Sequence, residues 1–276
     1  MKTFLRRTFS TVILLTLFFA SVFWKGAPGS LLFGVLAILL CFFALREFTV
    51  ILEKSGTPAD PKYTPLFAGL TVIPALCGNF DYSALIAGLF IVQSWALFLV
   101  SKNQKDVMYR ILSSTAAFFL FTIPVLMIVF IYQRNPLLFF YLVLVTKISD
   151  IGAYVTGTVS NALTKGGNHK MVPSISPGKS YEGAVGGIVA AVAASFIIWP
   201  HCGLVNTLWF PAAAGIVLFF GSMAGDLAES AFKRICQVKD SGNFLPGIGG
   251  IFDLVDSLLI NGVLFFLFLH FFVPAA

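Results

Sequence analysis

The sequence predicts an all-α integral membrane protein with about nine transmembrane helices. Three observations support this fold class: 58% of the 276 residues are hydrophobic, 31 of them are Phe, and the mean hydropathy is +0.92. In soluble domains, apolar residues make up only about half of the chain. The apolar residues also gather in long runs separated by Gly, Pro, Asn or charged residues, as in helices that use lipid as their solvent.

Nine apolar runs are candidate spans, because one helix across the bilayer core needs about 20 residues. The third run is short and contains Pro74, so it is the weakest candidate. The first run follows basic residues, as a secretory signal would, but it extends to Trp24 without a small-x-small cleavage site, so we expect a retained helix. The nine runs cover residues 8–24, 31–52, 64–78, 82–100, 111–132, 137–158, 181–200, 207–224 and 254–273.

The basic residues indicate how these spans are oriented. If the N-terminus lies inside the cell, 15 of the 18 Lys and Arg residues lie on the inner side, counting Arg46 near the inner end of the second run; Lys25 and Arg134 fall in outer segments, and Lys147 lies within a span. This bias follows the positive-inside rule. The net charge of +6 is then explained by topology and by attraction to anionic headgroups, and it requires no nucleic-acid partner. We expect a multi-pass protein of the bacterial inner (cytoplasmic) membrane.

We expect a single membrane domain over residues 1–276, because no internal repeat or long linker divides the chain. We interpret residues 1–140 as an apolar helical scaffold whose charges lie in loops. Residues 141–276 carry the polar segments and form the expected catalytic half. The four cysteines show no C-x-x-C spacing, so we interpret them as unpaired apolar residues rather than as a disulfide or zinc site.

The first polar segment is TKISDIGAYVTG, which carries Lys147 and Asp150 one helical turn apart inside the sixth predicted span. A charge inside the membrane is costly unless it is paired or hydrated, so both residues are candidates for a functional site. A Lys–Asp pair at i, i+3 that neutralises itself is the structural alternative.

The second polar segment is VPSISPGKSYEGAVGG. Its Gly178, Lys179 and Ser180 look like the end of a phosphate-binding loop, but Pro173 stands where that motif needs Gly. Ser180 can still cap the seventh helix, whose free N–H groups and positive dipole end attract anions beside Lys179. The alternative is a capped helix start with a positive-inside lysine.

The third polar segment begins with GSMAGDLAESAFKR, where Asp226, Glu229 and Lys233 share one helix face. An exposed ion pair is a structural alternative for Glu229 and Lys233. The segment continues through DSGNFLPGIGG, whose Gly and Pro content is typical of a loop that lets backbone amides approach a ligand.

Asp253 and Asp256 follow, one turn apart at the start of the ninth span. Two neighbouring carboxylates at a membrane boundary repel each other, at a cost on the order of several kcal/mol. A divalent cation is the simplest way to neutralise them, and carboxylates without His or Cys select a hard ion such as Mg²⁺. Together with the basic residues, this pattern predicts phosphate chemistry on the cytoplasmic side.

The pattern S-x-F-K-R-x₄-K-D-x-G-x₃-P-G-x-G-G-x-x-D-x-x-D, which runs from Ser230 to Asp256, resembles the signature of the CTP-dependent phosphatidate cytidylyltransferases (CDP-diacylglycerol synthases). SDIGAY, SISPGKSYEG and GDLAES are similar to segments of the same family, in the same order. The resemblance covers about residues 145–260; the first half is similar only in hydropathy. It implies an all-helical membrane protein whose site lies in a polar cavity open to the cytoplasm.

The resemblance implies that the CMP moiety of CTP is transferred to phosphatidic acid, giving CDP-diacylglycerol and pyrophosphate. Such a displacement needs metal ions and cations that stabilise the developing negative charge. By similarity, the catalytic residues are Asp226, Lys233, Asp253 and Asp256. The Mg²⁺ ligands or their support are Asp226, Glu229, Asp253 and Asp256. The substrate-binding residues are Asp150, Ser176, Lys179, Ser180, Glu182, Arg234, Lys239 and Asp240. A second cation and a homodimer are compatible with the resemblance.

The chain departs from the family pattern at two positions. Ile248 and Leu254 stand where the family usually has His and Arg, and the missing Arg would supply a bidentate phosphate contact. All the carboxylates and lysines remain, which favours an active enzyme over an altered substrate or a decayed copy. Two other functions stay open: a lipid or small-molecule transporter or flippase, which predicts inverted repeats, and a CTP-dependent polyprenol or phytol kinase-like enzyme.

Overall fold

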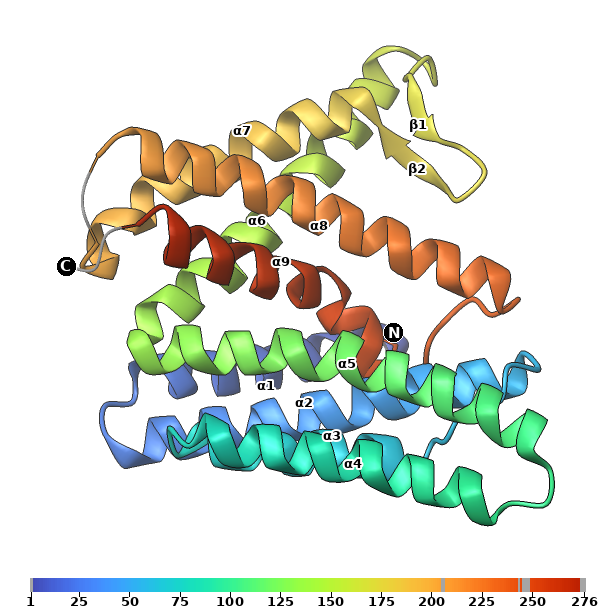
Figure 1. Cartoon of the computed structure of the whole chain (residues 1–276). Coiled ribbons are helices and arrows are strands. Elements are labelled where there is room, and N and C mark those ends of the chain that lie inside the picture. The colour runs from blue at the N-terminus through green and yellow to red at the C-terminus, as the bar shows by residue number, and fades with distance from the viewer. Residues whose placement is uncertain (1, 205–206, 243, 245–248, 274–276) are drawn as a thin grey trace. The chain divides into compact units, whose positions relative to one another are not determined.

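The computed structural model describes residues 2–204, 207–242, 244 and 249–273, with only the backbone of residues 2–7. The described residues are mostly helical, which confirms the predicted fold class (Figure 1). They form a short 3₁₀ helix η1 (Trp199–Cys202), a hairpin of β1 (Lys170–Val172) and β2 (Ser176–Ser180), and nine α-helices. These are α1 (Lys2–Phe23), α2 (Ala27–Lys54), α3 (Tyr63–Leu76), α4 (Phe80–Val100), α5 (Gln104–Arg134), α6 (Pro136–Leu163), α7 (Tyr181–Ile198), α8 (Trp209–Ile235) and α9 (Ile251–Phe271).

Each predicted run overlaps one of these helices, and in the described residues seven helices are long and apolar enough to cross a membrane. The protein is therefore a multi-pass membrane protein. The apolar parts of α1 and α3 are shorter, so nine spans stay a prediction. Helix α3, which contains Pro74, has 14 residues. At about 1.5 Å per residue it is shorter than the bilayer core of about 30 Å.

The described chain divides into two compact units. The first contains α1 to α5 and the chain from Ile235 to Val255, which includes the start of α9. Its core is rich in aromatic contacts, such as the stacked rings of Phe33 and Tyr132, whose centroids are 3.7 Å apart. Phe252, at the start of α9, contacts the rings of Phe48 on α2 and Phe121 on α5. These contacts hold the segment before α9 against the N-terminal helices.

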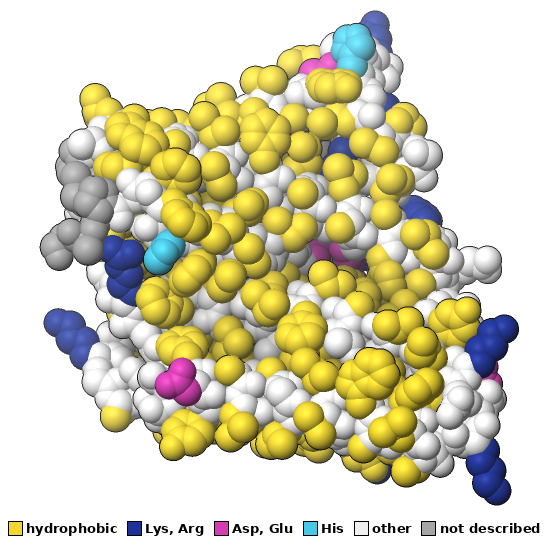
Figure 2. All heavy atoms as spheres, in the orientation of Figure 1, with side chains coloured by type: hydrophobic (Ala, Val, Ile, Leu, Met, Phe, Trp, Pro, Cys, Tyr) yellow, Lys and Arg dark blue, Asp and Glu magenta, His cyan; other side chains and the backbone are white. Residues whose placement is uncertain are grey.

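The second unit contains α6, the hairpin, α7, η1, α8 and the rest of α9. The fully buried Tyr141 lies in its core, where its ring packs with Trp199 and Phe265 and its hydroxyl is hydrogen-bonded to Ser195. Among the coloured side chains on the visible face, hydrophobic ones predominate (Figure 2). Large apolar residues stay exposed in both units, for example Val100 (80%) and Ile197 (70%), as expected of side chains that face lipid.

Candidate active site

Helices α6 and α7 of the second unit approach each other closely because small residues line their contact. A Cβ atom added at Gly186 would lie 2.0 Å from Thr156 Oγ1, and one added at Gly152 would lie 2.4 Å from the Ala190 Cβ. Small residues that let two helix backbones approach are typical of membrane-helix interfaces. The close pairing brings Asp150 on α6 and the segment before α7 to the same pocket.

The segment 176–180 forms strand β2, which the predicted all-α fold did not include, and it pairs antiparallel with β1, with Lys170 opposite Ser180. Ser180 ends the strand and begins α7. Its Oγ accepts a hydrogen bond from the Gly183 N–H at 3.1 Å, which confirms the predicted helix cap. Lys179 therefore lies directly before a helix N-terminus, where the helix dipole favours anions.

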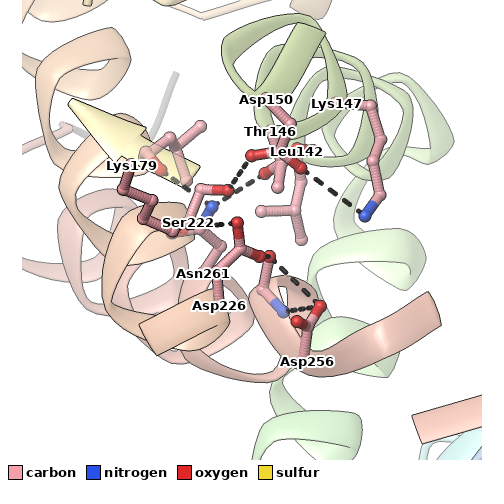
Figure 3. A network of polar contacts seen from close by, with 11 residues as sticks. Leu142, Thr146, Lys147, Asp150, Lys179, Ser222, Asp226, Asp256 and Asn261 are labelled. Carbon is pink, nitrogen blue, oxygen red and sulfur yellow. Dashed lines mark hydrogen bonds and ion pairs between the residues drawn. The ribbon is translucent and has the colours of Figure 1, made fainter. Parts of the chain in front are cut away.

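A chain of polar contacts joins β2, α8 and α9 (Figure 3). The Lys179 Nζ lies 3.0 Å from one carboxylate oxygen of Asp226, and the other Asp226 oxygen accepts a hydrogen bond from Ser257 Oγ at 2.6 Å. Ser257 Oγ also lies 3.2 Å from Asp256 Oδ1, which accepts a hydrogen bond from the Ser257 N–H at 2.5 Å. Two predicted site carboxylates thus converge on one fully buried hydroxyl, which has a single proton to donate.

Asp150 on α6 has two side-chain partners (Figure 3). It accepts a hydrogen bond from the hydroxyl of Ser222 on α8, and the Nζ of Lys147 lies 3.7 Å from its other oxygen. The i, i+3 pair that we considered as the structural alternative is therefore present. Both side chains are about one-third exposed, at 35% and 29%, so the ion pair by itself contributes little to stability.

Helices α8 and α9 meet where glycines of α8 face polar residues of α9. A Cβ atom at Gly225 would lie 2.6 Å from the Ser257 Cα, and one at Gly221 would lie 2.0 Å from Asn261 Oδ1. The fully buried Asn261 donates hydrogen bonds to Thr146 Oγ1 of α6 at 2.8 Å and to a carbonyl of α8 at 2.9 Å. Because buried polar groups are costly without partners, these bonds favour one register of α9 against its neighbours.

A pocket of about 440 Å³ opens beside Lys179 and Asp226, between α6, the hairpin, α7 and α8. Its lining combines basic and polar groups with apolar side chains such as Phe219 and Met223. This combination suits a ligand that carries both a phosphate and an apolar part. The predicted site residues in its lining are Asp150, Ser176, Lys179, Ser180 and Asp226.

Other predicted residues of this unit have different partners. Glu229 forms an ion pair with Lys233 at 2.6 Å, as the structural alternative required, but the two side chains are largely buried. Glu182 Oε1 accepts a hydrogen bond from the His169 N–H at 3.1 Å and lies 2.8 Å from its Nδ1, so it ties α7 to the chain before β1. Arg234 is exposed at the end of α8.

Asp253 belongs to the first unit. Its Oδ2 accepts hydrogen bonds from the Gly250 N–H at 3.0 Å and the Ser241 N–H at 3.3 Å. Hydrogen bonds from N–H groups favour the ionised carboxylate. Backbone donors therefore offset part of the desolvation that we had assigned entirely to a cation.

The remaining predicted positions lie near Asp253 in the chain. Lys239 and Asp240 are exposed between α8 and α9. Of the two departures from the family pattern, Leu254 is half-buried in the first turn of α9, and Ile248 lies outside the described residues.

Within the described residues, no group of three or more His, Cys, Asp or Glu side chains is arranged to hold a metal ion. Asp226 and Asp256 instead form a pair around the Ser257 hydroxyl. Mg²⁺ is usually held by only one or two carboxylates together with substrate phosphates. The pair therefore fits a Mg²⁺ ion that binds together with a phosphate-bearing ligand.

Sequence reasoning missed three residues of this network, Ser222, Ser257 and Asn261. Each is buried within a helix that is otherwise largely apolar. Ser and Asn inside a membrane helix are candidates for hydrogen bonds between helices, and this was the signal that could have identified them.

Comparison with known proteins decides the family. The family model described as "Cytidylyltransferase family" matches residues 5–272. The chain belongs to the cytidylyltransferase family. A phosphatidate cytidylyltransferase of Staphylococcus haemolyticus is 32% identical over 258 residues, which cover 90% of this chain and 93% of that protein. One from Staphylococcus epidermidis is 33% identical with the same coverage.

The match to the cytidylyltransferase family confirms the resemblance that we found in residues 145–260, and it extends through the first half of the chain. The chain is also similar, over a shorter stretch, to the Escherichia coli protein named "Uncharacterized protein YnbB", which is 39% identical over 139 residues. That stretch covers 50% of this chain and 44% of the other, so it supports a shared segment only.

Proposed function

We propose that this cytidylyltransferase-family protein transfers the CMP moiety of CTP to phosphatidate, giving CDP-diacylglycerol and pyrophosphate for phospholipid biosynthesis. The observation that carries the proposal is the similarity, over 90% of the chain, to proteins named phosphatidate cytidylyltransferase. The pocket beside Lys179 and Asp226 supports it, because its basic and apolar lining suits a lipid phosphate.

In this reaction a phosphate oxygen of phosphatidate forms a bond to the α-phosphorus of CTP. The bond from that phosphorus to the oxygen shared with the β-phosphate breaks, and pyrophosphate leaves with that electron pair. Negative charge develops on the transferring and leaving groups. Lys179, which lies in the pocket lining next to the α7 N-terminus, is suited to bind one of these phosphate oxygens.

The proposed Mg²⁺ site centres on the carboxylates of Asp226 and Asp256, with Asp253 one turn before Asp256 on α9 and Glu229 near Asp226 on α8. A bound Mg²⁺ ion would neutralise charge on the triphosphate and orient the leaving group. Lys233 is proposed to be catalytic, and a second cation and a homodimer stay predictions. The other proposed substrate-binding residues are Asp150, Ser176, Ser180, Glu182, Arg234, Lys239 and Asp240.

The direct test is an assay of the purified protein with CTP, Mg²⁺ and phosphatidate. We expect CDP-diacylglycerol and an equal amount of pyrophosphate, loss of turnover when EDTA removes Mg²⁺, and weaker turnover with ATP or GTP. Equal use of ATP or GTP would contradict the proposed nucleotide preference. Phosphorylation of a polyprenol by CTP, without CDP-diacylglycerol formation, would favour the kinase-like alternative.

We propose that the active site faces the cytoplasm, because the basic residues of the chain concentrate on the side assigned as inner. In that orientation the segment between α3 and α4 lies outside. Cys77 is exposed there, whereas the other three cysteines are buried.

We therefore expect a membrane-impermeant maleimide to label the wild-type protein in intact spheroplasts and to leave the Cys77→Ser variant unlabelled. Labelling of Cys77 only after the membrane is opened would contradict the nine-span orientation. Labelling in permeabilised cells serves as the control for the reactivity of the thiol.

A further inference from the structure

Glu47, on helix α2 of the first unit, contacts a segment about 200 residues later in the chain. Its Oε2 accepts a hydrogen bond from the Phe252 N–H at 2.9 Å, across a separation of 205 residues. The same oxygen lies 3.4 Å from Ser241 Oγ. Glu47 therefore touches both sides of the glycine-rich stretch between Ser241 and Phe252. We predicted that the charges of residues 1–140 lie in loops, which is wrong for Glu47, because it lies inside helix α2.

Two glycines leave the space that the Glu47 carboxylate occupies. A Cβ atom added at Gly242 would lie 2.3 Å from Glu47 Oε1, and one added at Gly250 would lie 2.5 Å from Oε2. Both distances are far below a van der Waals contact, so a side chain at either position would displace the carboxylate. Gly242 and Gly250 thus have a structural role, because they leave room for the Glu47 side chain.

The contact to Phe252 satisfies a donor that the helix itself leaves free. Helix α9 begins at Ile251, so the Phe252 N–H lies in the first turn and has no partner within the helix. A carboxylate at this position accepts the free N–H and interacts favourably with the positive end of the helix dipole. Asp253 also accepts hydrogen bonds from free backbone donors: its Oδ2 accepts from the N–H groups of Gly250 and Ser241.

We propose that Glu47 is a positioning residue, which holds the start of α9 and thereby sets the position of the Asp253 carboxylate. This inference rests on the proposed function, in which Asp253 supports the Mg²⁺ site. Glu47 itself is proposed to touch no reacting atom. It acts through Asp253, because both carboxylates contact Ser241 and a backbone N–H group at the start of α9, that of Phe252 for Glu47 and that of Gly250 for Asp253.

The test uses Glu47→Gln and Glu47→Ala in the full-length protein. The matched control is Glu53→Gln on the same helix, which removes the charge from a half-exposed ion pair with Arg110. The first measurement is amide hydrogen exchange of peptides that cover residues 249–255, without substrate. We expect at least about 10-fold faster exchange there in Glu47→Ala, a smaller increase in Glu47→Gln, whose amide oxygen can still accept one bond, and no change in the control.

The second measurement separates positioning from simple stabilisation. We expect Glu47→Ala to lower kcat about 10- to 100-fold, as loss of a residue that orients a metal ligand typically does, with an unchanged KM for phosphatidate. In a double-mutant cycle, adding Glu47→Ala to Asp253→Asn should lower kcat no further, because both changes act through one group.

Wild-type exchange at residues 249–255 in Glu47→Ala would overturn the proposal. A lower melting temperature with unchanged kcat would also overturn it, because it would show a purely structural role. Additive losses in the cycle would show that Glu47 does not act through Asp253. If the wild-type protein makes no CDP-diacylglycerol, the proposed function fails, whereas the exchange measurement still reports on the contact itself.

Discussion

Asp226→Asn is expected to lower CDP-diacylglycerol synthesis by at least about 100-fold, the scale seen when one charge-stabilising group is removed from an active site. Asp226 contacts both Lys179 and Ser257 and lines the pocket. The substitution keeps the shape of the side chain and its ability to accept from Ser257, but it removes the negative charge proposed to bind Mg²⁺. We therefore expect turnover to need a higher Mg²⁺ concentration, measured as a full Mg²⁺ titration of initial rates.

Asp81→Asn is the matched control, because Asp81 is an exposed acid at the start of α4 in the other unit. It should leave both turnover and the Mg²⁺ response unchanged. An Asp226→Asn enzyme with wild-type Mg²⁺ dependence and a much lower melting temperature would contradict the proposed role. Asp226 would then serve mainly as the partner of Lys179.

Lys179→Met is expected to reduce kcat/KM for CTP by about 100-fold, while the protein still folds. The methionine keeps most of the length of the side chain but cannot donate to a phosphate. Lys179 Nζ lies 3.0 Å from Asp226 and 3.4 Å from the Met223 carbonyl, so one of its three N–H donors is left for a ligand at the pocket. Steady-state kinetics with CTP and with phosphatidate varied separately measure the effect on each substrate.

Lys165→Met is the control for this prediction, since Lys165 is exposed and lies on the same predicted side of the membrane. It removes the same charge outside the pocket, and it should leave kcat/KM for CTP nearly unchanged. If Lys179→Met also keeps wild-type kinetics, Lys179 is explained by the positive-inside rule alone. A combined Lys179→Met and Asp226→Asn variant should lose less than the product of the single losses, because the two side chains are in contact.

The hydrophobic runs overlap all nine α-helices of the described chain, and the predicted Ser180 cap is confirmed. They did not predict the β-hairpin before α7, because a segment rich in Ser, Pro and Gly has no periodicity that distinguishes a strand from a turn. The eighth apolar run, 207–224, marks only the membrane span, and the helix face predicted for the residues after it is confirmed. Helix α8 continues to Ile235, so that Asp226, Glu229 and Lys233 lie on a regular helix.

The sequence predicted several residues of the site, but it did not predict which residues they contact. Asp150, Ser176, Lys179, Ser180 and Asp226 do line one pocket. We expected Glu182 to bind substrate and Glu229 to support Mg²⁺. Their described partners are His169 and Lys233. Sequence spacing identifies which side chains share a helix face, but it carries no information about which helix that face meets.

The sequence by itself determined that the protein lies in lipid, which parts of the chain form its long helices, and which family signature it carries. The reason is that a membrane has no water to satisfy backbone groups, so each span must be an apolar helix of a certain length. Only the tertiary structure decided that Ser257 lies between Asp226 and Asp256, and that Glu47 binds the start of α9. Those contacts join residues far apart in the chain, and they depend on how closely glycines let particular helices and loops approach.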